Sequence, residues 1–191
     1  MEPYEILTGV GELYTAPTGT AFPDVEDAPG VAWRSLGPTQ DGVTVTLDQK
    51  VDEHRVDQET GPVKASRSEE SCLLETTLAE ATLENLAEVL GATVEDTAAG
   101  SGTVGIREVP LYRGAVVGTR AFLFRGKSAY GNFNAQYELP YGYFGGPVEM
   151  KDTKDGNRAI AVEFHVLVNP NASTDAEKFG RLVMQDAVAL P

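Results

Sequence analysis

The residues of this 191-residue chain that could carry out catalysis or bind a metal are few and lie far apart. Its two histidines, His54 and His165, have no cysteine or further histidine at the spacing that zinc sites use. The single cysteine, Cys72, lies among apolar residues that alternate as in a β-strand. That pattern favours burial over a reactive thiol, and one cysteine excludes an intrachain disulfide. We therefore expect no metal site, no cofactor and no catalytic residues.

Three further features fall short of the sites that they resemble. The segment Gly126–Gly131, GKSAYG, lacks the glycine spacing of a nucleophile elbow. Asp152–Asn157 lacks the spaced acids and the final glutamate of a calcium loop, and its Asp155-Gly156 pair predicts a hairpin turn. The many carboxylates of residues 48–67 show no sign of a dry pocket that would shift their pKa values. We expect a protein that is not an enzyme.

The charge of the chain is strongly asymmetric. It has 29 acidic and 15 basic residues, and residues 1–100 hold 20 of the acids and only 5 of the bases. A net charge of −14 repels phosphate backbones and argues against a protein that reads nucleic-acid sequence. The N-terminus lacks a basic region and an apolar stretch, and no segment approaches the about 20 apolar residues of a membrane span. We expect synthesis in the cytosol and no membrane anchor.

The elements that must position the polar residues are mainly β-strands. The length fits one domain over residues 1–191, and 20 glycines and 11 prolines indicate many turns. Alternating apolar residues predict a series of short strands. A long loop at 16–38 carries the only tryptophan, Trp33, which we expect to be a core or subunit-contact anchor. The predicted strands are 6–15, 43–47, 70–77, 103–109, 111–117, 119–125, 132–139, 148–151, 158–168 and 181–184.

A short amphipathic helix is predicted at residues 82–90. Apolar residues recur at helical spacing from Leu83 to Leu90 and form one stripe. Thr82 suits the N-cap, and Gly91 suits the left-handed position after the helix. Because so short a helix is unstable alone, we expect it to flank a sheet.

A long polar segment, Asp48–Arg67, separates two of the predicted strands, and we call it the arm. Its apolar residues are Val51, Val56 and Val63. Two hypotheses stand: a flexible surface loop, or an ion-pairing arm that becomes ordered against a neighbouring subunit. The charged residues of the arm that we expect to make such contacts are Asp48, Lys50, Asp52, Glu53, Arg55, Asp57, Glu59, Lys64 and Arg67.

Three passages carry a resemblance to a known family. They are GVGELYTAPTGTAFPD from Gly9, VAWRSLGPTQDGVTVTLDQKVDEHRVDQETGPVKA from Val31 and LLETTLAEATLENLAEVLG from Leu73. Together they resemble the tail tube (major tail) proteins of long-tailed bacteriophages. The resemblance covers residues 9–91 most closely and residues 103–185 by strand order.

The resemblance implies a β-sandwich or half-barrel with one flanking helix and a long hairpin arm. It further implies hexameric rings that stack into a tube through which DNA leaves the virion, without catalysis or a cofactor. The arm would reach the adjacent ring. Partners would be further copies of the chain and other tail proteins, such as the tape measure, the terminator and the tail tip. The protein would occupy the host cytoplasm before assembly and the virion tail afterwards.

DNA would pass the lumen of such a tube without specific binding, so the lumen should be acidic or neutral. The polar faces of the central strands supply candidates for this lining. The expected lumen residues are Thr44, Thr46, Glu75, Thr77, Asn134, Gln136 and Glu138.

Two other classes of protein remain open at this point. One is a different virion or injection-tube component of the same architecture, such as a tail terminator or a contractile inner tube. The other is a ligand-binding β-sandwich, for instance a carbohydrate-binding module. The aromatic residues that could form a glycan platform in that case are Tyr137, Tyr141, Tyr143 and Phe144.

Overall fold

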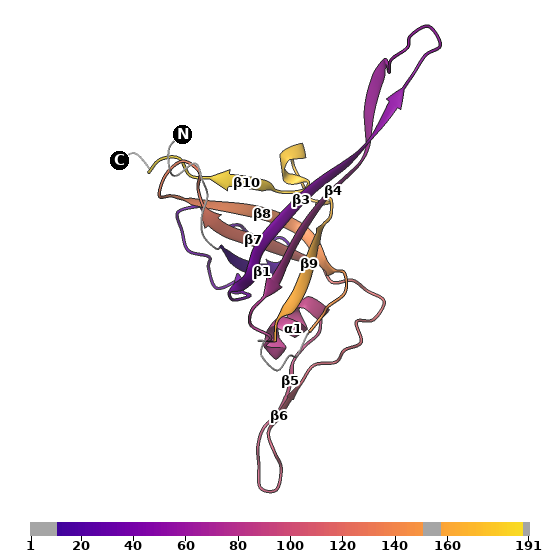
Figure 1. Cartoon of the computed structure of the whole chain (residues 1–191). Helices are drawn as coiled ribbons and strands as arrows, with labels where there is room; N and C mark the ends of the chain where they lie inside the picture. The colour runs from indigo at the N-terminus through magenta and orange to yellow at the C-terminus, as the bar shows by residue number, and fades with distance from the viewer. Residues whose placement is uncertain (1–10, 151–157, 189–191) are drawn as a thin grey trace.

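The computed structural model describes residues 11–150 and 158–188 (Figure 1). They form a mainly β structure with one α-helix, α1 (Leu83–Leu90), and a 3-10 helix at Asp175–Glu177. The strands are β1 (Glu12–Pro17), β2 (Arg34–Ser35), β3 (Thr39–His54), β4 (Lys64–Leu78), β5 (Glu95–Thr97), β6 (Ile106–Glu108), β7 (Arg120–Lys127), β8 (Asn134–Gly145), β9 (Ile160–Val166) and β10 (Arg181–Met184).

Eight of these strands form one antiparallel sheet that is strongly curved. Its order is β2-β1-β7-β8-β9-β4-β3, with β10 on β8. The first half of β8 pairs with β10 and its last four residues pair with β9. Phe122 of β7 and Phe164 of β9 belong to strands about 9.5 Å apart in a flat sheet, yet their ring centroids lie 4.7 Å apart. The sheet therefore bends around its own inner face, which confirms the predicted half-barrel type of fold.

The core lies on the concave face of this sheet. Alternate residues of strands from both ends of the sheet are fully buried there, because the bend brings both ends onto one cluster. Leu86 and Val89 of α1 pack against the same cluster and close its open side. The fully buried strand residues are Leu13, Leu74, Leu78, Phe122, Ile160 and Phe164.

The predicted helix and both of its ends are confirmed. Thr82 Oγ1 accepts a hydrogen bond from the backbone N–H of Asn85 at 3.2 Å, so Thr82 is the N-cap. Gly91 ends the helix in the left-handed conformation, with φ at 67°. The backbone N–H of Ala92 then bonds the carbonyl of Ala87 at 2.8 Å.

The loop between β1 and β2 covers one half of the outer, convex face of the sheet. Trp33 is buried against Ala121 and Leu123 of β7, and its Nε1 donates to the carbonyl of Ala21 at 3.0 Å. Arg125 of β7 donates to the carbonyls of Asp24 and Val25 at 2.8 and 3.1 Å. Trp33 is therefore a core anchor, the first of the two roles predicted for it.

Three predictions of strand and turn are wrong. The strand expected at 148–151 is reduced, over residues 148–150, to a single bridge between Met150 and Ile160. The strand expected at 111–117 is an extended loop, because Pro110 and the left-handed Gly114 interrupt any ladder. Residues 140–145 of the turn expected at 140–147 are instead the second half of β8. There the register with β7 shifts, so Ala121 faces both Pro140 and Tyr141, and the bulge accommodates a proline that has no N–H to donate.

Some predictions fall outside the described residues. These are the first part of the strand expected at 6–15 and the hairpin turn at Asp155-Gly156. Strand β1 pairs with β7 along all six of its residues. The short strand β2, within the loop predicted at 16–38, pairs with the other edge of β1.

Candidate functional site

The arm projects from the sheet as a paired hairpin. Strands β3 and β4 pair from Thr39 opposite Leu78 to His54 opposite Lys64, whereas β9 pairs with β4 only at Leu73–Leu78. Beyond Leu73 no strand of the described residues pairs with the hairpin on its β4 side, and the end of the hairpin extends away from the rest of the molecule (Figure 1). From Asp48 to His54 it covers about 23 Å at about 3.3 Å per residue. Most of the arm is thus strand, and only residues 55–63 form a loop.

A β-bulge interrupts the β3–β4 hairpin at Ser68, directly after the last residue of the arm. Lys50 pairs with Glu69 and Val51 pairs with Arg67, so Ser68 has no residue opposite it. Its hydroxyl lies 3.4 Å from the carbonyl of Lys50. Because a bulge increases local twist, Ser68 influences the direction in which the end of the arm points.

Polar side chains hold the two strands of the arm together across the hairpin. Lys50 Nζ lies 3.1 Å from Glu69 Oε1, and Arg67 Nε donates to Gln49 Oε1 at 2.7 Å. His54 Nε2 lies 2.6 Å from Ser66 Oγ. All these groups are exposed, so each contact contributes at most about 1 kcal/mol. A two-stranded ribbon held in this way is marginally stable by itself.

The end of the arm carries charges and apolar groups without partners. Four acids and one base occur in residues 52–60. Arg55 pairs with Glu53 at 3.2 Å, whereas Asp52, Asp57 and Glu59 make no ion pair within the described part of the chain. Three valines nearby are each 43–51% exposed: Val51, Val56 and Val63.

Four of the expected lumen residues share one face. Thr44 lies opposite Glu75, and Thr46 lies opposite Leu73, on the convex side of β3 and β4. Thr44, Thr46 and Glu75 are exposed and Thr77 is half-buried. The face continues onto β9 through Glu163 and His165, whose Oε2 and Nε2 lie 3.3 Å apart.

The prediction that Gln136 and Glu138 lie on a solvent-exposed face is wrong. They are 1% and 4% exposed, because the β1–β2 loop covers this part of the convex side. Gln136 Nε2 donates to the carbonyl of Pro23 at 2.8 Å and to Glu138 Oε1 at 2.7 Å. Arg181 Nε donates to Glu138 Oε2 at 2.7 Å, and this carboxylate raises the pKa of Arg181. Asn134, half-buried, donates to the carbonyl of Val25 at 3.1 Å.

Sequence reasoning missed this buried network. Alternation along β8 correctly separates the residues of its two faces, but it cannot show that a distant loop covers the polar one. The available signal was the combination of a carboxylate and two amides on one strand face with Arg125 on the neighbouring strand.

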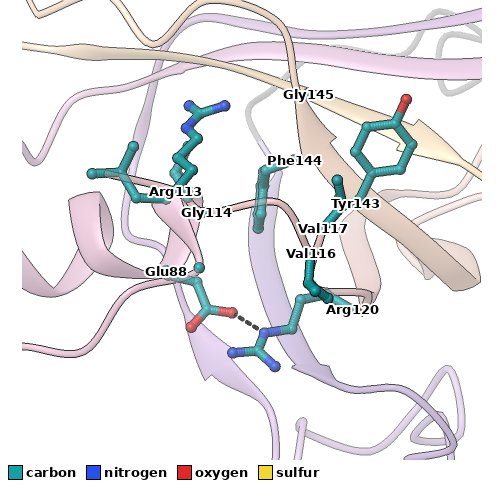
Figure 2. Close-up of a pocket in the computed structure, with 13 residues that line it drawn as sticks. Glu88, Arg113, Gly114, Val116, Val117, Arg120, Tyr143, Phe144 and Gly145 are labelled. Atoms are coloured by element: carbon teal, nitrogen blue, oxygen red, sulfur yellow. Dashed lines mark hydrogen bonds and ion pairs between the residues drawn. The ribbon is translucent and has the colours of Figure 1, made fainter. Parts of the chain in front are cut away.

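A cleft of about 350 Å³ lies at the end of the sheet away from the arm, between α1, the end of β8 and residues 113–118. Figure 2 shows Glu88 and Arg120 joined at this cleft, with Val116 and Val117 on the side of Tyr143. Glu88 Oε1 accepts from Arg120 Nε at 2.7 Å and from the hydroxyl of Thr15 at 3.1 Å. A carboxylate held in this way is poorly suited to act as an acid or a base.

The other side chains that could take part in catalysis or metal binding lie apart from one another. Burial raises the pKa of the Cys72 thiol, which disfavours the thiolate. Within residues 11–150 and 158–188, no group of three or more His, Cys, Asp or Glu side chains could hold a metal ion. No helix in this described part is long and apolar enough to cross a membrane.

The aromatic residues considered for a glycan platform do not share an exposed face. Phe144 is 8% exposed and belongs to the core. Tyr137 stacks on Phe124 with ring centroids 6.0 Å apart. Tyr143 stacks on His165 at 5.2 Å, on the convex side.

A curved sheet with free edges, a projecting hairpin and exposed apolar residues is typical of a structural subunit that is completed by assembly. The comparisons with known proteins agree with this class. The family model of the phage tail tube protein matches residues 3–186, so the chain belongs to the phage tail tube protein family. It is a structural protein of the virion tail. A search of curated proteins gave no match to the chain.

Proposed function

We propose that this protein forms hexameric rings that stack into the tail tube, and that the tube delivers DNA to the host. The match of the tail tube family model over residues 3–186 is the observation that carries the proposal. The chain would be made in the host cytoplasm, and it would meet the tape measure, terminator and tail tip proteins during assembly. DNA would pass without specific binding.

The edges of the sheet support assembly into a ring. Strand β3 has 16 residues and pairs only with β4, so its other edge is unpaired within the described chain. At the opposite end of the sheet, β2 is also an edge strand. Long unpaired edges favour association with another strand. In a closed ring, the backbone groups of every edge can pair with a neighbouring subunit, so open-ended aggregation is avoided.

The open part of the convex face supports a role as the lumen lining. It carries hydroxyl groups and carboxylates and lies on the side of β3, β4 and β9 that the β1–β2 loop leaves uncovered. Such a surface repels DNA or has no attraction for it, so the polymer slides instead of binding. We propose that the residues that face the DNA are Thr44, Thr46, Glu75 and Thr77.

The arm supports stacking of rings in one direction. It projects beyond the sheet, its own contacts are weak, and its end has unpartnered charges. Contact with the adjacent ring would order it and would use the charged residues predicted from the sequence, from Asp48 to Arg67.

Deletion of residues 52–62 tests this function. We expect a folded protein that no longer forms long tubes, because the residues removed lie at the projecting end of the β3–β4 hairpin, beyond the pairing of β4 with β9, and outside the core. Negative-stain electron microscopy would measure tube length, and circular dichroism with urea unfolding would show that the fold is retained. A Lys127→Ala variant, changed at an exposed residue of β7, serves as the control and should form tubes of normal length. Normal tubes from the deletion variant would contradict the role of the arm.

A further inference from the structure

A second projecting region lies at the end of the molecule opposite to the arm. It consists of the small β5–β6 hairpin and the loop that follows it, and Figure 1 shows it pointing away from the arm. We call residues 104–118 the receptor segment. It contains six apolar residues that are 48–86% exposed: Val104, Ile106, Leu111, Tyr112, Val116 and Val117.

Such a run of exposed apolar residues on a soluble chain marks an interaction surface. The receptor segment also borders the cleft of about 350 Å³, which Val116 and Val117 line together with Leu90 of α1 (Figure 2). A concave apolar site beside exposed apolar residues can receive small side chains from a partner.

Exposed ion pairs join the start of the receptor segment to α1 and β5. Arg107 of β6 pairs with Glu84 of α1 at 2.6 Å and with Asp96 of β5 at 3.7 Å. A backbone hydrogen bond lowers the pKa of Glu84, and Arg107 lowers it further. The hairpin is therefore tied to the first turn of α1, which itself packs on the core.

An unpaired cation of the receptor segment is complementary to unpaired acids of the arm. The receptor segment contains two arginines and one glutamate, whereas residues 52–60 of the arm contain four acids and one arginine. Arg107 is ion-paired within its own copy, whereas Arg113 makes no ion pair within the described residues and lines the cleft. Asp57 and Glu59 of the arm are likewise without ion-pair partners there. An unpaired cation and unpaired acids at opposite ends favour contact between two copies arranged head to tail.

We propose that the receptor segment and its cleft bind the arm tip, residues 51–63, of a second copy of this chain in the adjacent ring. The inference rests on the proposed stacking of rings and names the surface that the arm contacts. Val51, Val56 and Val63 of the tip contact the apolar side chains of the receptor segment, and the acids of the tip lie near Arg113. Because the two surfaces lie at opposite ends of the chain, each copy uses both.

Disulfide crosslinking tests the contact directly. In a Cys72→Ala background, Val56→Cys is combined with Val116→Cys, and assembled tubes are oxidised. We expect a ladder of covalent multimers on denaturing gels, since every copy carries one cysteine of each kind. The matched control combines Val56→Cys with Val31→Cys, because Val31 is fully exposed but lies in the β1–β2 loop. The control should remain monomeric.

Tubes that form normally and give no ladder, or a ladder of equal yield in the control, would overturn the inference. Absence of tubes from the unmodified protein would instead count against the proposed function, so the two failures are distinguishable. Unassembled protein at the same concentration should give no ladder.

Charge reversal provides a second measurement. Arg113→Glu is expected to raise the concentration needed for tube formation by about tenfold, because an attractive contact becomes a repulsive one. Combining it with Asp57→Lys and Glu59→Lys should restore assembly to within about threefold. All three side chains lie on exposed loops, so the fold should be unaffected. Failure of the combined variant to recover would contradict this pairing of surfaces.

Discussion

The carboxylate of Glu138 is buried beneath the β1–β2 loop and is neutralised from outside by Arg181. Arg181 Nε lies 2.7 Å from Glu138 Oε2, and Gln136 donates to the other oxygen. Removal of the guanidinium would leave a buried charge with one neutral donor, which costs more than the loss of a surface ion pair.

We therefore expect Arg181→Ala to lower the free energy of unfolding by about 2 kcal/mol, measured by urea denaturation. The double variant Glu138→Gln, Arg181→Ala should lose clearly less free energy of unfolding than Arg181→Ala alone, because it has no unpaired buried charge. Lys127→Ala should change stability by less than about 0.5 kcal/mol. Equal losses in the single and the double variant would show that the charge is not the cause.

Residue patterns predicted which side chains share a face, but not which faces remain open. Thr44, Thr46 and Glu75 are exposed as expected, whereas Val43 and Val45 between the threonines are half-buried. Gln136 and Glu138 alternate in the same manner and are buried. The difference arises from a loop more than 100 residues away in sequence, whose carbonyls bond Asn134 and Gln136. Local periodicity contains no information about such a cover.

Among the elements, α1 shows how local signals fix a boundary. The backbone of Gly91 has φ at 67°, a conformation that costs other residues about 1–2 kcal/mol. A Cβ added at Gly91 would meet no atom within 4 Å, so steric clash makes no contribution there.

Gly91→Ala is expected to lower the free energy of unfolding by about 1 kcal/mol through backbone strain alone. Gly30→Ala is the matched control, because its Cβ also meets open space but its φ is not in the left-handed region. That control should be neutral within about 0.5 kcal/mol in the same urea titration. Similar effects at the two glycines would contradict the conformational explanation.

The strands were less predictable than the helix, for physical reasons. Proline and glycine in residues 140–147 predicted a turn, but β8 continues through them with a bulge opposite Ala121. For the arm, the sequence left both a flexible loop and an ordered arm open, and backbone pairing with β4 extends β3 to His54. Cross-strand hydrogen bonds do not depend on apolar periodicity. A hairpin without a buried face is therefore hard to predict from the pattern of apolar residues.

For the whole molecule, the arm and the receptor segment lie at opposite ends, so the proposed stack of rings would have two different termini. One terminus would present arms and the other would present receptor segments. A copy without its tip would still be bound through its receptor segment by an arm, but it would have no arm tip to contact the ring beyond it.

We expect a small fraction of the variant lacking residues 52–62, mixed with intact protein, to shorten tubes out of proportion to its amount. At about one variant copy in six, an average ring of the proposed hexameric form would contain one, and tube length by electron microscopy should fall severalfold. The same fraction of the control variant Lys127→Ala should leave tube length unchanged. Tubes that shorten only in proportion to the diluted intact protein would contradict this expectation.

The bulge at Ser68 has a consequence for the symmetry of such a tube. In the proposed stack, the twist of the β3–β4 ribbon would set the azimuth at which each tip meets the next ring, and the unpaired residue at Ser68 increases that twist. Every ring would repeat the same angular offset from the ring before it. The helical parameters of an assembly many rings long would thus depend on the count of backbone residues in a single strand.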